Sequence, residues 1–174
     1  MHNTAYVAMG TNMPHRGVSG TALLRRAVHA LQATGVDVRA QSGVWQTAAW
    51  PPGVNQADYY NAVVAVDAAD MSPQTLYRRL REVEAQLGRE RRARWEPRTL
   101  DLDIVAMEGF VGAFGELTLP HARMHERAFV LAPLIEIAPN WRHPLLARSA
   151  AELLAELAAG RGYRRVDDLA PEAG

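Results

Sequence analysis

The stretch Leu100-Asp101-Leu102-Asp103-Ile104 alternates apolar and acidic residues, and this period of two is typical of a half-buried β-strand. Side chains alternate between the two faces of a strand, so we expect the apolar residues to face the core and the aspartates to face away from it. Two carboxylates that adjoin on one face repel each other unless a cation lies between them, and magnesium prefers oxygen ligands of this kind. The spacing favours a metal site at Asp101 and Asp103; two acids on a wet strand face are the alternative.

The segment that leads into this strand is rich in arginine. All 19 basic residues of the chain are arginine, and eight of them fall between Arg78 and Arg98. Without lysine, any phosphate group has to be bound by arginine forks. Fixed cations beside a carboxylate pair are what a metal–polyphosphate site requires. A solvated helix face and loop is the alternative interpretation of the same run.

The composition bounds the kind of protein. The chain has 174 residues, 48% of them apolar, and acidic and basic residues in equal number. It has no cysteine, which excludes disulfides, thiolate zinc sites and a cysteine nucleophile. No apolar run is long enough to cross a bilayer, and zero net charge gives no global attraction to nucleic acid. We expect one domain over residues 1–174, with a catalytic core over about 5–140 and a C-terminal helical tail over 145–174. We also expect a cytoplasmic monomer.

Apolar periodicity and turn residues predict the elements around this strand. Strands are expected over 6–9, 36–45, 60–67, 100–107 and 117–119, and helices over 19–34, 73–87, 127–137 and 149–159. Ser19 and Ser72 stand where helix N-caps belong, and Pro73 suits a first helical position. Residues 46–58 are predicted to form a long loop. The order strand, helix, strand, strand, helix, strand predicts an α+β, ferredoxin-like fold, a largely antiparallel sheet with helices packed on it in α-β-α layers.

The segment Arg94-Trp95-Glu96-Pro97-Arg98-Thr99-Leu100-Asp101-Leu102-Asp103-Ile104 resembles the signature of the 6-hydroxymethyl-7,8-dihydropterin pyrophosphokinases, a family of folate synthesis. The likeness extends over nearly the whole domain through further blocks in the same order: Gly10-Thr11-Asn12, Asp58-Tyr59-Tyr60-Asn61-Ala62, Leu119-Pro120-His121 and 133–139. The resemblance implies a magnesium-dependent transfer of diphosphate from ATP to the pterin alcohol, with AMP as the second product.

The resemblance also implies roles for individual residues. Asp101 and Asp103 would hold two magnesium ions and would be catalytic together with Arg89 and Arg98. The residues implied to contact ATP are Glu84, Arg91, Trp95, Arg98, Ile104, His121 and Arg127. The residues implied to contact the pterin are Thr47, Trp50, Tyr59, Asn61, Trp95 and Phe129. In this picture Tyr59 and Phe129 sandwich the flat ring, and Asn61 hydrogen-bonds its pyrimidine edge.

From the residues alone, these positions also have structural interpretations. Asn61 offers a donor and an acceptor together, as a pterin edge needs, but it could equally cap a strand end. Tyr59 and Phe129 could be core residues, and His121 could cap the helix that follows. Glu84 lies on the inner side of an amphipathic helix, where an acid needs a cationic partner, so a structural ion pair with a nearby arginine is an alternative. Four residues depart from the family pattern: Glu96 replaces a common glycine, Ala48 a common proline, Thr11 a serine, and Ala122 an aromatic residue found in some relatives.

Two other functions fit parts of the pattern. His121 and His125 are four residues apart and, with the two aspartates, fit a metal-dependent phosphohydrolase. The arginine loop fits a ferredoxin-like module that binds RNA, which would need exposed stacking aromatics on the sheet. Zero net charge argues against RNA binding. We therefore expect ATP and the pterin as partners, and neither nucleic acid nor membrane.

Overall fold

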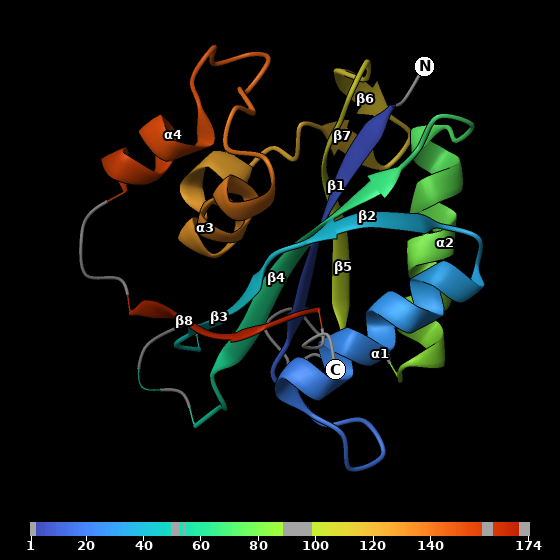
Figure 1. Ribbon diagram of the computed structural model, residues 1–174, viewed down its shortest axis with the longest axis vertical. Coiled ribbons are helices and arrows are strands. Elements are labelled where there is room, and N and C mark those ends of the chain that lie inside the picture. Colours follow the sequence, from blue (N-terminus) through green and yellow to red (C-terminus); the bar gives the residue numbers. More distant parts are fainter. Residues whose placement is uncertain (1–2, 50–52, 54, 89–98, 158–161, 171–174) are drawn as a thin grey trace.

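The computed structural model describes residues 3–49, 53, 55–88, 99–157 and 162–170. In this part of the chain one six-stranded sheet lies between two helical layers (Figure 1). Helices α1 (Gly20–Ala33) and α2 (Pro73–Gln86) cover one face; α3 (Ala128–Ile137) covers the other, and α4 (Ala150–Glu156) packs on α3.

The main sheet is antiparallel throughout the described pairings. Its strands are β1 (Thr4–Thr11), β2 (Asp37–Gln41), β3 (Gly43–Thr47), β4 (Tyr59–Asp67), β5 (Asp101–Met107) and β8 (Tyr163–Asp168). Their order is β5-β1-β4-β3-β8, with β2 also paired to β4. Strands β6 (Gly112–Phe114) and β7 (Leu117–Leu119) form a separate hairpin, and a 3-10 turn, η1, spans Met124–Glu126. The first two β-α-β units give the ferredoxin-like order, so the predicted α+β fold class is confirmed.

Two cores form because the central strands are buried on both faces. Strand β4 is buried from Asn61 to Val66, and its apolar side chains alternate between the two cores. The core toward α1 and α2 contains, among others, Val7, Met9, Leu24, Leu31, Val64, Leu76, Leu80, Leu102 and Ile104. The core toward α3 contains Tyr6, Val63, Ala65, Val105, Val130, Leu131 and Leu134. The sheet therefore presents one face to each helical layer.

The helix ends follow local sequence chemistry. Ser72 accepts a hydrogen bond from the Thr75 amide at 3.1 Å and Pro73 begins α2, as predicted. Ser149 and Glu152 form a capping box at the start of α4. Ser19 occupies the N-cap position of α1, but its side chain makes no capping hydrogen bond. None of the described helices is long and apolar enough to span a membrane.

The single strand predicted over 36–45 is wrong, because it is divided at Ser42 into β2 and β3. The Ser42 hydroxyl, in place of a main-chain carbonyl, accepts the Val63 amide at 2.9 Å. The Ser42 carbonyl turns away and accepts the Leu169 amide at 3.3 Å. A buried serine thus exchanges one ladder bond for a side-chain bond and starts a new strand, which runs on to Thr47.

The C-terminal tail was expected to be helical, and over Ala150–Glu156 it is. Beyond the helix, however, Tyr163–Asp168 forms strand β8 at the edge of the sheet. Its residues are mostly exposed, so the segment has no apolar alternation from which a strand could be predicted. The tail therefore contributes a strand to the sheet that the sequence did not reveal.

Candidate active site

Strand β5 presents the two aspartates as the alternation predicted. Leu102 and Ile104 are buried in the core under α1 and α2. Asp101 and Asp103 are partly exposed and point to the opposite face, the one that α3 covers further along. The neighbouring strand β1 places Gly10 beside Asp101 and Ala8 beside Asp103, so no bulky side chain stands over the pair from that strand. The carboxylates are thus open on the side where a ligand would approach.

Buried Glu84 on α2 holds the strand from beneath. One oxygen, Oε1, accepts the Leu102 amide at 2.8 Å, and the other lies 2.8 Å from a guanidinium nitrogen of Arg81. Arg81 also donates to the Leu102 carbonyl. The cationic partner expected for Glu84 is therefore Arg81, one helical turn earlier, and the pair fixes Leu102, the residue between the two aspartates.

Arg81 is a site residue that the sequence analysis did not single out. Its guanidinium lies 3.8 Å from Asp103 Oδ1, farther than from Glu84, and its plane stacks on Tyr77 at 4.7 Å. The Asp103 side chain is 36% exposed, so the arginine neutralises it in part without closing it to a cation. Its position three residues before a buried acid on the same helix face was the signal available in the sequence.

The charges around the aspartates act on one another. Partial burial raises the pKa of the Asp103 carboxyl above its usual range, and the charge of Asp101 raises it further. Nearby cations oppose this rise; they are His121, Arg81 and Arg127. Two neighbouring carboxylates whose charges repel each other are stabilised when a divalent cation binds between them.

His121 reaches this site from the loop after β7. Its main-chain amide donates to the Val105 carbonyl at 2.8 Å, which sets it alongside β5. Its Nδ1 accepts the Arg123 amide at 3.1 Å, so Nε2 carries the proton and is the donor toward a ligand. Burial and the charge of Arg127 lower the pKa of the imidazole, and the aspartates oppose that effect. His121 and Arg127 thus both lie close enough to Asp103 for their charges to act on it.

The donor set fits magnesium. Among the residues that the structure describes, no group of three or more histidine, aspartate or glutamate side chains could enclose a metal. Magnesium does not need such a cage, because it is usually held by one or two carboxylates together with waters and substrate phosphate oxygens. Asp101 and Asp103 are the residues that would hold it.

A row of residues across the sheet connects this pair to the polar groups expected to bind the pterin. Asp101 pairs with Gly10, Gly10 with Asn61, and Asn61 with Trp45. Paired residues share a face, and two strand spacings separate Asp101 from Asn61, about 10 Å. Gly10 between them leaves room for the Asn61 side chain, because a Cβ there would lie 3.2 Å from its oxygen. The row therefore places the Asp101 carboxylate and the Asn61 amide on one face of the sheet, about 10 Å apart.

The pterin residues on the strands lie together. Asn61 is buried, and its side-chain amide donates to Thr47 Oγ1 at 3.0 Å. Thr47 pairs with Tyr59, so all three residues lie on the α3 face of β3 and β4. Phe129 lies in the first turn of α3, with the Arg127 guanidinium 5.7 Å from its ring centroid.

Other predicted site residues fall elsewhere. The side chain of Ile104 is buried in the core on the opposite face from Asp103, so only its main chain is available to a ligand. Trp50, Arg89, Arg91, Trp95 and Arg98 lie outside the described residues.

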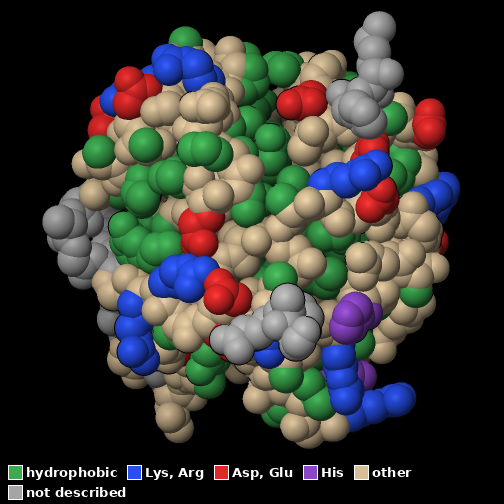
Figure 2. Space-filling model, in the orientation of Figure 1, with side chains coloured by type: hydrophobic (Ala, Val, Ile, Leu, Met, Phe, Trp, Pro, Cys, Tyr) green, Lys and Arg blue, Asp and Glu red, His purple; other side chains and the backbone are tan. Residues whose placement is uncertain are grey.

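His125 does not join His121 in a metal pair. Its ring packs edge-on against His143 with centroids 6.0 Å apart, and its Nε2 lies 3.8 Å from Glu126. This arrangement gives no support to the phosphohydrolase pair suggested by the spacing. On the face shown in Figure 2, basic side chains lie beside acidic ones in several small groups, so the described residues there form no single basic patch for RNA.

A cavity of about 530 Å³ lies away from this site. It is lined by residues at the far end of β5 and at the end of α3, among them Met107, Phe110 and Trp141. Asp101 and Met107 are separated by the length of the strand, about 20 Å. The candidate active site is therefore identified by its acidic and basic side chains, and not by a deep cavity.

Comparison with known proteins decides the family. The model of the 7,8-dihydro-6-hydroxymethylpterin-pyrophosphokinase family matches residues 6–139, more than half of the chain. The chain belongs to this family. A pyrophosphokinase of this type from Methylorubrum extorquens, named 2-amino-4-hydroxy-6-hydroxymethyldihydropteridine pyrophosphokinase, is 41% identical over 138 residues, 78% of this chain and 83% of the relative. The protein of the same name from Bacillus subtilis is 40% identical over 139 residues, 79% of each chain.

Solved structures of the family share the fold. Plasmodium falciparum HPPK-DHPS, wild type with pteroate, superposes with a TM-score of 0.70 at 12% identity and covers 95% of this chain. This chain spans 48% of that one, about half its length. The pyrophosphokinase match ends at Pro139, so α4 and β8 lie beyond the part of the chain that the family model describes.

Proposed function

We propose that the protein transfers diphosphate from ATP to 6-hydroxymethyl-7,8-dihydropterin, giving AMP and the pterin diphosphate, as a step of folate biosynthesis. One observation carries the proposal: Asp101 on β5 stands in one row with the buried amide of Asn61 on β4, and Asp103 lies two residues further along the same face of β5. The family membership and the names of the relatives support it.

At the metal end, Asp101 and Asp103 would hold two magnesium ions, which when bound would neutralise the triphosphate and make the pterin alcohol a better nucleophile. The protein's own cations there, Arg81, Arg127 and the Nε2–H of His121, would bind and orient phosphate oxygens. Arg89 and Arg98 would add charge to the same phosphates, with Arg91 and Trp95 against the nucleotide. Glu84 would act through β5 rather than by touching ATP, since both its oxygens are engaged by Leu102 and Arg81.

At the pterin end, Asn61 would bind the pyrimidine edge, because an amide presents a donor and an acceptor together. The hydrogen bond to Thr47 fixes the orientation of that amide before the substrate arrives. Tyr59 and Phe129 would stack on the ring, with Trp50 and Trp95 closing the pocket.

The chemistry requires positioning more than covalent help. The hydroxymethyl oxygen attacks the β-phosphorus of ATP and loses its proton, the bond from that phosphorus to the α,β-bridging oxygen breaks, and AMP leaves with the bridging oxygen. Such transfers are accelerated mainly by alignment and charge neutralisation. The row from Asp101 to Asn61 supplies the alignment by holding both substrates on one face of one sheet. We further propose that the enzyme acts as a cytoplasmic monomer.

The test is incubation of the protein with ATP, magnesium and 6-hydroxymethyl-7,8-dihydropterin, followed by chromatography of nucleotides and pterins. We expect AMP and pterin diphosphate in equal amounts, and neither product without the pterin or with EDTA. Release of inorganic phosphate independent of the pterin would contradict the proposal and point to a phosphohydrolase. A gel-filtration mass of one chain is the corresponding expectation for the monomer.

A further inference from the structure

We propose that strand β8 is a positioning element of the pterin site, which it holds through two hydrogen-bond chains, one on each face of β3. The inference rests on the proposed function, because the ligand concerned is the pterin. Strand β8 lies beyond the residues that the family model matches, yet it pairs with the strand that carries Thr47.

The register brings β8 next to the pterin residues. Tyr163 pairs with Thr47, Arg164 with Gln46, and Arg165 with Trp45. On its other side β3 is paired to β4 only from Trp45 to Thr47. Strand β8 therefore supplies the second of two ladders that hold this short strand.

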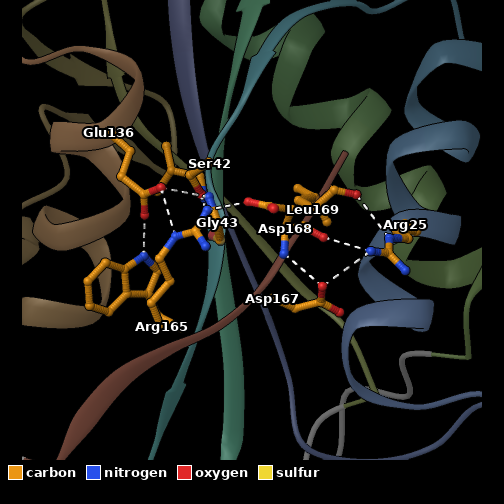
Figure 3. A network of polar contacts seen from close by, with 10 residues as sticks. Arg25, Ser42, Gly43, Glu136, Arg165, Asp167, Asp168 and Leu169 are labelled. Atoms are coloured by element: carbon orange, nitrogen blue, oxygen red, sulfur yellow. Dashed lines mark hydrogen bonds and ion pairs between the residues drawn. The ribbon is translucent and has the colours of Figure 1, made fainter. Parts of the chain in front are cut away.

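The first chain lies on the α3 face. The Glu136 carboxylate of α3 accepts the Gly43 amide at 3.1 Å, the Trp45 indole N–H at 2.5 Å and Arg165 Nε at 3.2 Å. Figure 3 shows Glu136 reaching from α3 to Gly43, with Arg165 meeting the same carboxylate. Arg165 also pairs with Asp168. Helix α3, β3 and β8 thus share one carboxylate, and the main-chain oxygen of Trp45 faces the Asn61 amide at 3.5 Å.

Gly43 shows how closely β8 approaches β3. Its backbone does not have positive φ, so the turn itself does not demand glycine. A Cβ at this position would instead overlap the Arg165 guanidinium. The glycine therefore leaves room for the Arg165 guanidinium of β8 against the β3 backbone.

The second chain lies on the opposite face, toward α1. Arg164 donates to Gln46 Oε1 at 2.8 Å, and Gln46 donates through Nε2 to Asp58 Oδ2 at 2.9 Å. Gln46 and Asp58 stand at the two ends of the segment that connects β3 to β4, and Tyr59 follows Asp58 directly. The chain therefore ties β8 to β3 and to Asp58, the residue that precedes Tyr59 at the start of β4.

The far end of β8 is itself anchored. Arg25 of α1 donates to the Asp168 carbonyl at 2.8 Å and to the Leu169 carbonyl at 3.1 Å, and it lies 3.5 Å from the Asp167 carboxylate. These contacts are drawn on the α1 side of Figure 3. Anchored in this way, an edge strand can hold β3 in place, which an unanchored one could not.

The test uses Arg165→Met and Arg164→Ala, alone and combined, in the full chain, with Arg148→Ala as the matched control. Arg148 pairs with Glu156 in the same C-terminal region and is remote from β3. Calorimetry measures the Kd of 6-hydroxymethylpterin in the presence of Mg²⁺ and α,β-methylene ATP, and separately the Kd of the nucleotide. We expect the double variant to weaken pterin binding about tenfold, about 1.4 kcal/mol, and to leave nucleotide binding within about twofold.

Equal loss of both ligands, or no loss of either, would overturn the inference. If Arg165→Met does not fold, Gln46→Leu can be used instead, because it breaks the second chain alone. This variant is expected to weaken pterin binding by a smaller factor and to leave nucleotide binding unchanged. A wild-type chain that binds the nucleotide but not the pterin would instead refute the proposed function. Hydrogen exchange gives an independent readout: the amides of Gln46 and Thr47 are expected to exchange faster in the double variant and not in the control.

Discussion

The metal end and the pterin end of this site lie on the same face of one sheet but are held in different ways. Asp101 and Asp103 are on a strand whose inner side is buried, and the buried Glu84 bonds the residue between them. Thr47 is on a short strand near the sheet edge, held through exposed side chains such as Arg165 and Gln46. The two aspartates are therefore positioned by the hydrophobic core, whereas the pterin site is positioned by side-chain contacts at the edge of the sheet.

The largest effect on activity is expected from substitution of the two aspartates at the metal end. Asp101→Asn or Asp103→Asn should lower kcat/KM by about 10³-fold, the scale of a lost electrostatic contact to the transferred group. Steady-state AMP production measures it. Asp70→Asn, an exposed acid in the turn before α2, is the control and should stay near wild type. A variant at either site residue with wild-type turnover would remove the metal end from the mechanism.

The next effect concerns Glu84, which supports β5 and does not itself contact the substrates in this account. Glu84→Ala should reduce the free energy of unfolding by about 3 kcal/mol, because it leaves the Leu102 amide and the Arg81 charge without their partner. Urea titration measures this change. Glu82→Ala on the exposed side of the same helix is the control, with an expected change within about 0.5 kcal/mol. Similar stability of the two variants would mean that the core does not hold β5 in the way described.

A smaller and more selective effect is expected at the pterin end. Asn61→Ala should raise the pterin KM about tenfold and leave the ATP KM nearly unchanged, since the amide is a hydrogen-bonding group of the pterin pocket alone. The two KM values from one set of initial rates decide the matter. Asn140→Ala, an exposed amide after α3, should change neither. Equal increases in the KM for the pterin and the KM for ATP would contradict the separation of the site into a metal end and a pterin end.

The smallest effect concerns neither end. Burial lowers the pKa of the His143 imidazole, and the nearby His125 lowers it further; His143 Nδ1 accepts the amides of Leu145 and Leu146 at 3.3 Å. The folded state therefore resists a proton that the unfolded state accepts, so stability is full above about pH 6.5 and falls as the pH is lowered. Thermal unfolding from pH 7.5 to 5 should show a Tm decrease that is shallower in His143→Gln than in His29→Gln, an exposed histidine of α1. Identical slopes of Tm against pH in the two variants would contradict the attribution of this pH dependence to His143.

The sequence could predict the features that local patterns determine, but not those that depend on distant contacts. The alternation over 100–104 and the Ser72-Pro73 helix start are local patterns, and both appear in the structure as expected. The break at Ser42 depends on a hydrogen bond to Val63, twenty-one residues away, and β8 has an exposed, polar sequence whose pairing arises from distant partners. Arg81 became visible as a site residue only when α2 was placed beneath β5. Predictions from sequence succeeded where a period or a cap fixes the geometry and failed where tertiary contacts do.

The central claim is that Asp101 and Asp103 bind divalent cations together with the nucleotide. Manganese can replace magnesium as a paramagnetic probe, and its free concentration can be followed by electron paramagnetic resonance during titration with α,β-methylene ATP present. The account predicts two tightly bound ions per wild-type chain, and loss of at least one in Asp103→Asn. Undiminished binding of both ions by the Asp101→Asn, Asp103→Asn double variant would contradict it.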